Sequence, residues 1–209
     1  MNNSLSSQSS SLRQDTAGIS RLPVRLYHAG FQVIEKPDIH RGRRNADFGW
    51  GFYLTPDEDF AVKWAREQKD RRTFINRYDF DWDGLAVVRL QRDSAWFACL
   101  SANRAGAPDP YSGADVIAGP IANDILYDTQ GLITSGFLTP QQSLRLLQLG
   151  PEYTQIALKT EKAASHLRFV DALELDSARL AASRKLVLRE EQVYQQLFAE
   201  ELAKMLEEE

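Results

Sequence analysis

The sequence contains few of the cysteine and histidine residues that form disulfide bonds or bind metal ions. It holds one cysteine, Cys99, in 209 residues, which excludes an internal disulfide and fits a reducing compartment. The apolar neighbours of Cys99 predict a buried structural thiol rather than a nucleophile. The three histidines, at positions 28, 40 and 166, lie far apart, and none has the spacing of a zinc motif. We therefore expect no metal.

Long apolar runs are also missing. No stretch approaches the ~20 apolar residues that span a bilayer, and the first residues lack the apolar segment of a secretory signal. These absences predict a soluble, cytoplasmic protein with no membrane partner. The formal net charge is only −4, so overall electrostatics makes no case for a nucleic-acid partner.

The residues that are present suit one globular domain with terminal extensions: 43% are hydrophobic and 26% are charged. Residues 1–20 are mostly polar and predict a flexible tail. We expect the folded domain over residues 21–180 and an amphipathic helix over residues 181–209, with Val193, Leu197, Leu202 and Met205 near helical spacing. The tail and this helix are candidate sites for a protein partner.

Local patterns predict strands alternating with helices. Thr55 followed by Pro56 predicts the start of a helix that reaches about Arg71 and buries Trp64. The turn signal Asp83-Gly84 predicts a hairpin between residues 73–79 and 85–91. Further strands are expected over residues 24–27, 115–118, 155–159 and 168–175, and further helices over residues 93–102 and 139–149, with a short helix or turn over 120–129.

Three segments contain the candidate functional residues. The first is a short strand that runs into His28-Ala29-Gly30, and the third is a strand with Gln155. Between them, residues 45–55 combine two glycines with four aromatic residues, after the basic loop 41–44. Side chains alternate along a strand, so Tyr53 would face away from Phe52 and Leu54 and offer its ring to a cleft. An ordinary buried strand, with Tyr53 packed on Trp64, is the alternative.

In this order the segments resemble the ADP-ribosyltransferase superfamily, in the branch whose motifs are a histidine, a tyrosine and an acid or amide. More narrowly, residues 25 to about 169 look like a bacterial domain family of unassigned function that is grouped with these transferases. Further matching segments are residues 36–39, 46–49, 115–120 and 160–163. The resemblance implies an α+β fold, with an ADP-ribosyltransferase-like split mixed/antiparallel β-sheet core and flanking helices.

The resemblance also implies roles in binding NAD. His28 would hydrogen-bond the adenine-side ribose, the backbone of Ala29 would hold the nicotinamide carboxamide, and Tyr53 would stack on the nicotinamide ring. Gln155 would be the third catalytic residue, with His28 and Tyr53. The other candidate cofactor-binding residues are Gly30, Phe48, Gly51, Arg43 and Arg44. Phe48 and Trp50 could instead cap the cleft. The arginines at 41, 43 and 44 suit a pyrophosphate or an acceptor phosphate, with a solvated loop as the alternative.

Two residues depart from the best-known members, which have glycine after the histidine and glutamate at the third motif. Ala29 and Gln155 stand at these positions. His28 could also be a satisfied core histidine. Five polar residues that belong to recurring motifs of the resemblance are expected mostly to cap turns: Asp47, Asn103, Asp115, Asn123 and Asp124.

The resulting hypothesis is a NAD-dependent mono-ADP-ribosyltransferase that modifies an intracellular protein or nucleic acid, with a bacterial toxin or defence effector as one such role. A NAD glycohydrolase using the same cleft is the enzymatic alternative. A catalytically silent module of the same fold, which binds a nucleotide or a partner, is the alternative from another class.

Overall fold

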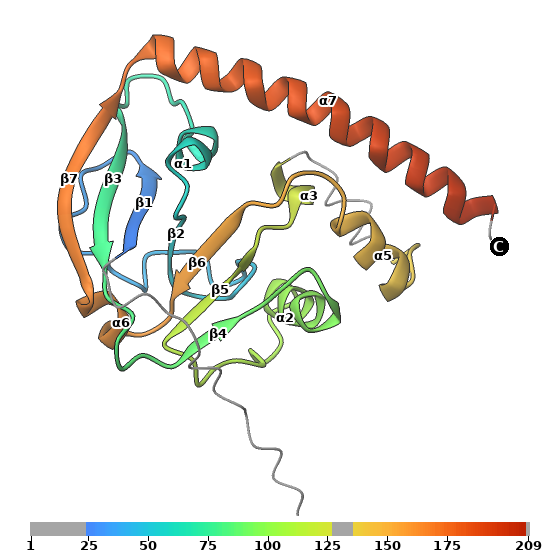
Figure 1. Cartoon of the computed structure of the whole chain (residues 1–209), viewed down its shortest axis with the longest axis horizontal. Helices are drawn as coiled ribbons and strands as arrows, with labels where there is room; N and C mark the ends of the chain where they lie inside the picture. Colours follow the sequence, from blue (N-terminus) through green and yellow to red (C-terminus); the bar gives the residue numbers. More distant parts are fainter. Residues whose placement is uncertain (1–23, 127–135, 208–209) are drawn as a thin grey trace, which may run out of the picture.

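The computed structural model describes residues 24–126 and 136–207. The predicted tail, residues 1–20, and the end of the predicted helix or turn at 120–129 lie outside the described residues. Within the described parts, the fold consists of two β-sheets that face each other, with helices around them (Figure 1).

The first sheet is antiparallel, with β3 (Thr73–Phe80) between β1 (Val24–Gly30) and β7 (Leu167–Leu175). The second sheet has the order β2-β6-β5-β4 and is mixed, because only β4 and β5 run parallel. Its strands are β2 (Phe52–Leu54), β4 (Val87–Arg89), β5 (Val116–Pro120) and β6 (Thr154–Leu158). The expected α+β class with a split mixed/antiparallel sheet is confirmed.

Apolar side chains pack on both faces of the second sheet. On one face, Phe52 and Ile156 pack against Leu26 and Tyr78 of the first sheet. On the other face, Ile117 and Ala157 pack in a second cluster with residues of α2 (Ser94–Arg104). Cys99 lies in this second cluster with no exposed surface, so the prediction of a buried thiol is confirmed.

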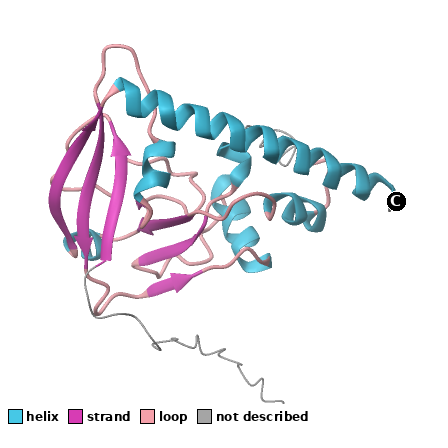
Figure 2. Ribbon diagram, turned by 45° about the horizontal axis from the view of Figure 1, so that its top comes forward, coloured by secondary structure: helices cyan, strands magenta, loops and turns pink. Residues whose placement is uncertain are grey.

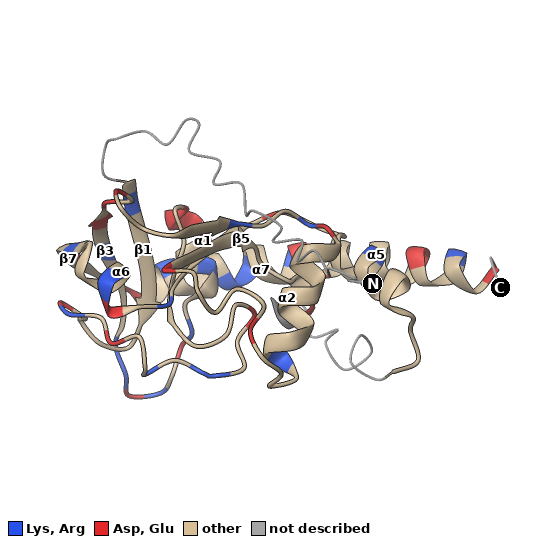
Figure 3. Ribbon diagram, turned by 90° about the horizontal axis from the view of Figure 1, so that it is seen from below, with Lys and Arg blue, Asp and Glu red and all other residues tan. Residues whose placement is uncertain are grey.

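The remaining helices cover the edges and ends of the sheets. They are α1 (Glu58–Trp64), α3 (Asn123–Leu126), α5 (Pro140–Leu147), α6 (Glu161–Ser165) and α7 (Ser177–Glu207). The long helix α7 follows β7, runs along one side of the molecule and extends past α5 (Figures 1 and 2). Residues of both charge signs lie along it (Figure 3). No helix in the described residues has the length and apolarity to span a membrane.

The hairpin predicted between residues 73–79 and 85–91 is wrong. β1 and β7 occupy both edges of β3, so no edge remains for the chain that follows the Asp83-Gly84 turn. β4 instead joins the second sheet, parallel to β5. β5 also continues through Gly119 and Pro120, past residue 118, where the predicted strand ends.

The first helix is shorter than predicted. Asp57, not Thr55, is its N-cap: Asp57 has extended backbone angles and its side chain accepts the backbone N–H of Phe60 at 3.0 Å. The helix ends at Trp64 instead of Arg71, because Ala65 takes up an extended conformation. Trp64, which was expected in the core, is 38% exposed.

The C-terminal helix begins at Ser177, before the predicted boundary at residue 181. Its buried side chains differ from those expected: Tyr194 and Phe198 pack against Leu146 of α5, while Val193 and Leu197 are exposed. Met205 is buried as predicted. The inward face is therefore set by the position of α5, which the spacing along α7 alone does not reveal.

Candidate functional site

A cavity of about 750 Å³ lies where the two sheets separate. β1 and β2 touch through one pair of backbone hydrogen bonds, between Tyr27 and Thr55, with N–O distances of 2.9 and 3.0 Å. Beyond that pair the strands diverge. Small-molecule sites commonly enclose ~300–1,000 Å³, so the cavity has the size of a ligand site. Its lining includes residues of β1, β2, α1, β6 and the loops at 31–47 and 65–71.

The ionisable side chains that line the cavity are mostly basic. Asp38 and Asp47 are the two acids among the described lining residues. The bases are Lys36, Arg41, Arg43, Lys63, Arg66 and Arg71. This excess of positive charge favours an anionic ligand, since guanidinium groups bind phosphate in a two-pronged geometry.

His28 lies at the divergence of β1 and β2. Its Nδ1 is 2.7 Å from the carbonyl oxygen of Tyr53, and its ring stacks on Phe52 with the ring centres 4.5 Å apart. Burial lowers the pKa of His28, although the hydrogen bond to the Tyr53 carbonyl opposes this shift. The imidazole is therefore neutral at pH 7. A carbonyl oxygen only accepts, so Nδ1 carries the proton and Nε2 is left as an acceptor.

Gly30 lies beside Nε2 of His28, and a Cβ atom added there would lie 3.4 Å from that nitrogen, an ordinary contact distance. Gly51 cannot carry a side chain without a shift of the backbone, because a Cβ there would lie 2.6 Å from the carbonyl oxygen of Leu158. Three of the candidate ligand-binding residues, Ala29, Gly30 and Gly51, line the cavity.

Tyr53 lines the same cavity as His28, but its hydroxyl group has fixed partners. It donates to the carbonyl oxygen of Gly49 at 2.7 Å and accepts the backbone N–H of Phe48 at 2.9 Å. Burial and the nearby charge of Asp47 raise the pKa of this phenol well above its ordinary value. Tyr53 therefore remains neutral, and its two hydrogen bonds fix the backbone of the loop at Phe48 and Gly49.

The ring of Tyr53 packs against the second core cluster, on the face of the second sheet opposite Phe52 and the ring of His28. Core packing of Tyr53, the alternative from the sequence, is therefore observed, although its partner is this cluster and not Trp64, whose ring lies against Phe60.

Two of the predicted ligand-binding residues lie elsewhere. Phe48 has no exposed surface and packs in the second core cluster, against Gly119, so it can neither bind a cofactor nor cap the cavity in this structure. Arg44 is absent from the described lining of the cavity, and its guanidinium stacks on the ring of Trp50 at 4.3 Å. Arg43 does line the cavity.

Gln155 reaches the floor of the cavity from β6 and is 2% exposed. Its Nε2 donates to Oδ2 of Asp47 at 3.0 Å and lies 3.4 Å from the carbonyl oxygen of Pro120. A carboxylate only accepts hydrogen bonds, so the contact with Asp47 fixes which end of the Gln155 amide is the NH₂ group. The amide is thus held in one orientation.

Asp47 belongs to a buried network that sequence reasoning missed. Nε of Arg104 donates to Asp47 at 2.9 Å, and Nη1 of Arg104 donates to Asp124 at 2.6 Å. Burial opposes the charge on Arg104, but the two carboxylates outweigh this effect and raise its pKa. Two carboxylates and one guanidinium leave one negative charge beside Gln155.

The expected turn-capping role is therefore wrong for Asp47 and Asp124. It is wrong for Asn123 as well, whose amide donates to the carbonyl oxygens of Leu149 and Pro151. Arg104 follows Asp47 by 57 positions, and no spacing signal links residues so far apart. Asp115 does accept a backbone N–H, from Ala86 at 2.9 Å, and also pairs with Lys162.

Comparison with known proteins gives one match. Neither a curated protein nor a solved structure is significantly similar to the chain. Residues 24–169 match the family described as "Protein of unknown function (DUF3990)". This match covers both sheets as far as Phe169 in β7, with every residue that lines the cavity, and ends before α7. The chain therefore belongs to the DUF3990 family of proteins of unknown function.

Proposed function

We propose that the protein binds NAD in this cavity and transfers a single ADP-ribose unit to an intracellular macromolecule, as a member of the His-Tyr-Glu/Gln branch of the ADP-ribosyltransferase superfamily. The observation that carries the proposal is that one cavity is lined by His28, Tyr53 and Gln155, which come from three different strands. These are the residues that the resemblance assigns to the three motifs.

The lining suits a dinucleotide. The basic side chains complement a pyrophosphate, and Arg41 and Arg43 are on the loop that the sequence singled out for this purpose. Nε2 of His28 is an acceptor for one ribose hydroxyl group. The backbone at Ala29 and Gly30 lies along the cavity beside it and offers N–H and C=O groups to a carboxamide.

NAD supplies a glycosidic bond to nicotinamide, which leaves as a neutral molecule when the bond breaks. The positive charge then develops on the ribose, as an oxocarbenium ion. Groups that stabilise this charge therefore accelerate the reaction. Gln155 has no charge, but its amide is held against the carboxylate of Asp47, which also lines the cavity. In this proposal Gln155 orients the ribose, and Asp47 supplies the negative charge that the amide lacks.

Release of nicotinamide from NAD tests the proposal and separates it from the alternatives. Transfer predicts release that requires an added lysate or acceptor, with label from the ADP-ribose part retained on a macromolecule. Release in buffer alone would identify a NAD glycohydrolase. No release under either condition would contradict both enzymatic functions and leave a silent binding module. Digestion of the labelled product with protease or nuclease then assigns the acceptor as a protein or a nucleic acid.

A further inference from the structure

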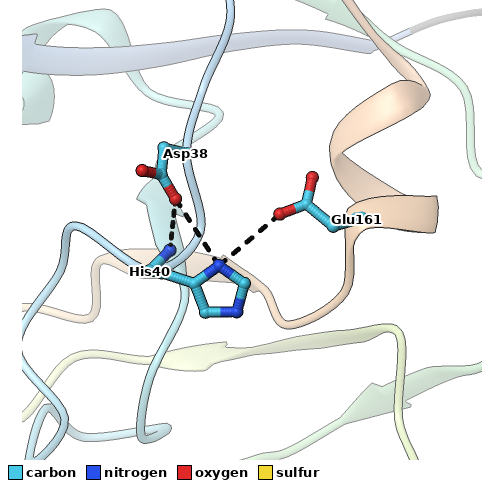
Figure 4. Close-up of side chains that lie close together, drawn as sticks. All are labelled: Asp38, His40 and Glu161. Carbon is cyan, nitrogen blue, oxygen red and sulfur yellow. Dashed lines mark hydrogen bonds and ion pairs between the residues drawn. The ribbon is translucent and has the colours of Figure 1, made fainter.

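We propose that Asp38, His40 and Glu161 form a binding site for one divalent transition-metal cation, with Zn²⁺ as the best chemical match. Figure 4 shows the imidazole of His40 between the two carboxylates. Its Nδ1 is 3.6 Å from Oδ1 of Asp38 and 3.6 Å from Oε1 of Glu161. One donor atom from each residue lies within 4.8 Å of the other two.

The separations are close to those of a coordinated ion. Zn²⁺ binds histidine nitrogen and carboxylate oxygen at ~2.0–2.2 Å, so ligand atoms in a tetrahedral site lie about 3.4 Å apart. The two distances from the imidazole already approach that value. The carboxylates must come closer to each other, and the side chain of Glu161, which is 69% exposed, has the freedom to move. Three protein ligands would leave a fourth position for water or a ligand.

Trp50, outside the cluster, positions His40. The ring of His40 meets Trp50 edge-on, with the ring centres 4.8 Å apart, and Nε1 of Trp50 donates to the carbonyl oxygen of His40 at 3.0 Å. Within the cluster, the backbone N–H of His40 donates to Oδ1 of Asp38 at 2.8 Å. An ion pair among side chains this exposed stabilises a fold by only ~0–1 kcal/mol. A divalent cation would bind the imidazole and both carboxylates at once.

The site would connect two parts of the chain at the rim of the cavity. Asp38 lines the cavity, while Glu161 is the first residue of α6, which directly follows β6. A bound cation would fasten the loop that contains Asp38 to the second sheet. It would also add positive charge beside Arg41. The histidine spacing gave no sign of this site, because Glu161 is far from His40 in the sequence. The proposal does not depend on NAD chemistry.

Isothermal titration of the full-length, untagged, chelator-treated protein with Zn²⁺ tests the site. The expected result is one ion per chain, with a dissociation constant that rises at least tenfold in His40→Ala, a loss of at least about 1.4 kcal/mol. Glu161→Gln should weaken binding in the same direction while leaving the His40 loop intact. His166→Ala is the matched control, because His166 is also at the surface but contacts the carbonyl oxygen of Asp81.

Two results would overturn the proposal. One is the absence of heat from Zn²⁺ binding in the wild-type protein at millimolar concentration. The other is equal affinity in the wild type, His40→Ala and Glu161→Gln, which would place the ion at other surface groups. Circular dichroism of each variant verifies that the fold is kept. Because the readout is binding of the metal alone, its outcome is separate from that of the NAD assay.

Discussion

Gln155→Glu is the substitution that best tests the charge beside the cavity. It introduces a second carboxylate about 3.0 Å from that of Asp47, where Gln155 now donates a hydrogen bond. At an effective dielectric constant of ~20, two unit charges at that distance repel by about 5 kcal/mol. Protonation is the less costly response, because keeping a carboxyl group with an ordinary pKa of ~4.3 neutral at pH 7 costs about 3.7 kcal/mol. We therefore expect the variant to lose about 2–4 kcal/mol of unfolding free energy at pH 7.

The pH dependence of this loss identifies its cause. The introduced carboxyl group has a higher pKa in the folded state than in the unfolded state, so the folded variant binds the extra proton. Its stability then falls as pH rises above ~4.3, and the difference from the wild type vanishes near pH 4. Urea denaturation of both proteins between pH 4 and 8 measures the difference. A variant as stable as the wild type at pH 7 would refute the charge assigned to Asp47.

The double variant Asp47→Asn/Gln155→Glu is the matched control, because it exchanges the two groups and keeps one carboxylate and one amide in contact. It should recover part of the stability that the single change removes, because an amide at position 47 still accepts the hydrogen bond from Arg104 but loses the ion pair. Asp47→Asn alone measures the cost of losing that pair. If the double variant remains as unstable as Gln155→Glu after this cost is subtracted, the loss arises from packing on β6 rather than from repulsion between carboxylates.

Three further predictions concern His28, Cys99 and Gly49. Because burial lowers the pKa of His28, its contribution to stability is present above pH ~6.5 and is lost as pH falls. Urea midpoints measured from pH 8 down to pH 5 should therefore fall more steeply in the wild type than in His28→Gln. Parallel curves for the two proteins would contradict this. Cys99 is fully buried and burial raises its pKa to about 11, so a thiol reagent at pH 8 should label it only after denaturant is added; rapid labelling of the native protein would refute its place in the core. Gly49→Ala should lower the unfolding free energy by ~1–3 kcal/mol, because Gly49 has a φ of +74° and an added methyl group would overlap the amide of Asn103. An unchanged melting temperature would show that the loop around Gly49 can rearrange.

Local signals in the sequence predicted several elements because their causes are local. Thr139 forms a capping box at the start of α5, where a helix was predicted from residue 139, and α2 begins directly after Asp93, whose side chain caps it. The three motif residues that the resemblance named, His28, Tyr53 and Gln155, line one cavity, and their roles there remain predictions. Alternation along residues 73–79 predicted β3 within one residue.

Such local signals could not predict contacts between segments that are far apart in the sequence. Which strands occupy the edges of β3 depends on β7, nearly a hundred residues later, and so the predicted hairpin with residues 85–91 failed. The same limit applies to the buried network. Nothing near Asp47 in the sequence indicates that Arg104 and Asp124 would surround it and turn its carboxylate toward Gln155.

The most direct test of the proposed function is transfer of label from NAD in a cell lysate by the wild type and by Gln155→Ala. The account predicts slow addition of single ADP-ribose units by the wild type, without polymer, because the negative charge comes from Asp47, one hydrogen bond away from Gln155, and not from the third-motif residue itself. Loss of a preorganised group typically costs up to ~10²–10³ in rate. Gln155→Ala should transfer nothing, while its NAD affinity, measured by thermal shift, stays within tenfold, or about 1.4 kcal/mol. Equal transfer by both proteins would show that the third motif is misplaced. No transfer, no nicotinamide release and no NAD-dependent thermal shift in the wild type would contradict the account.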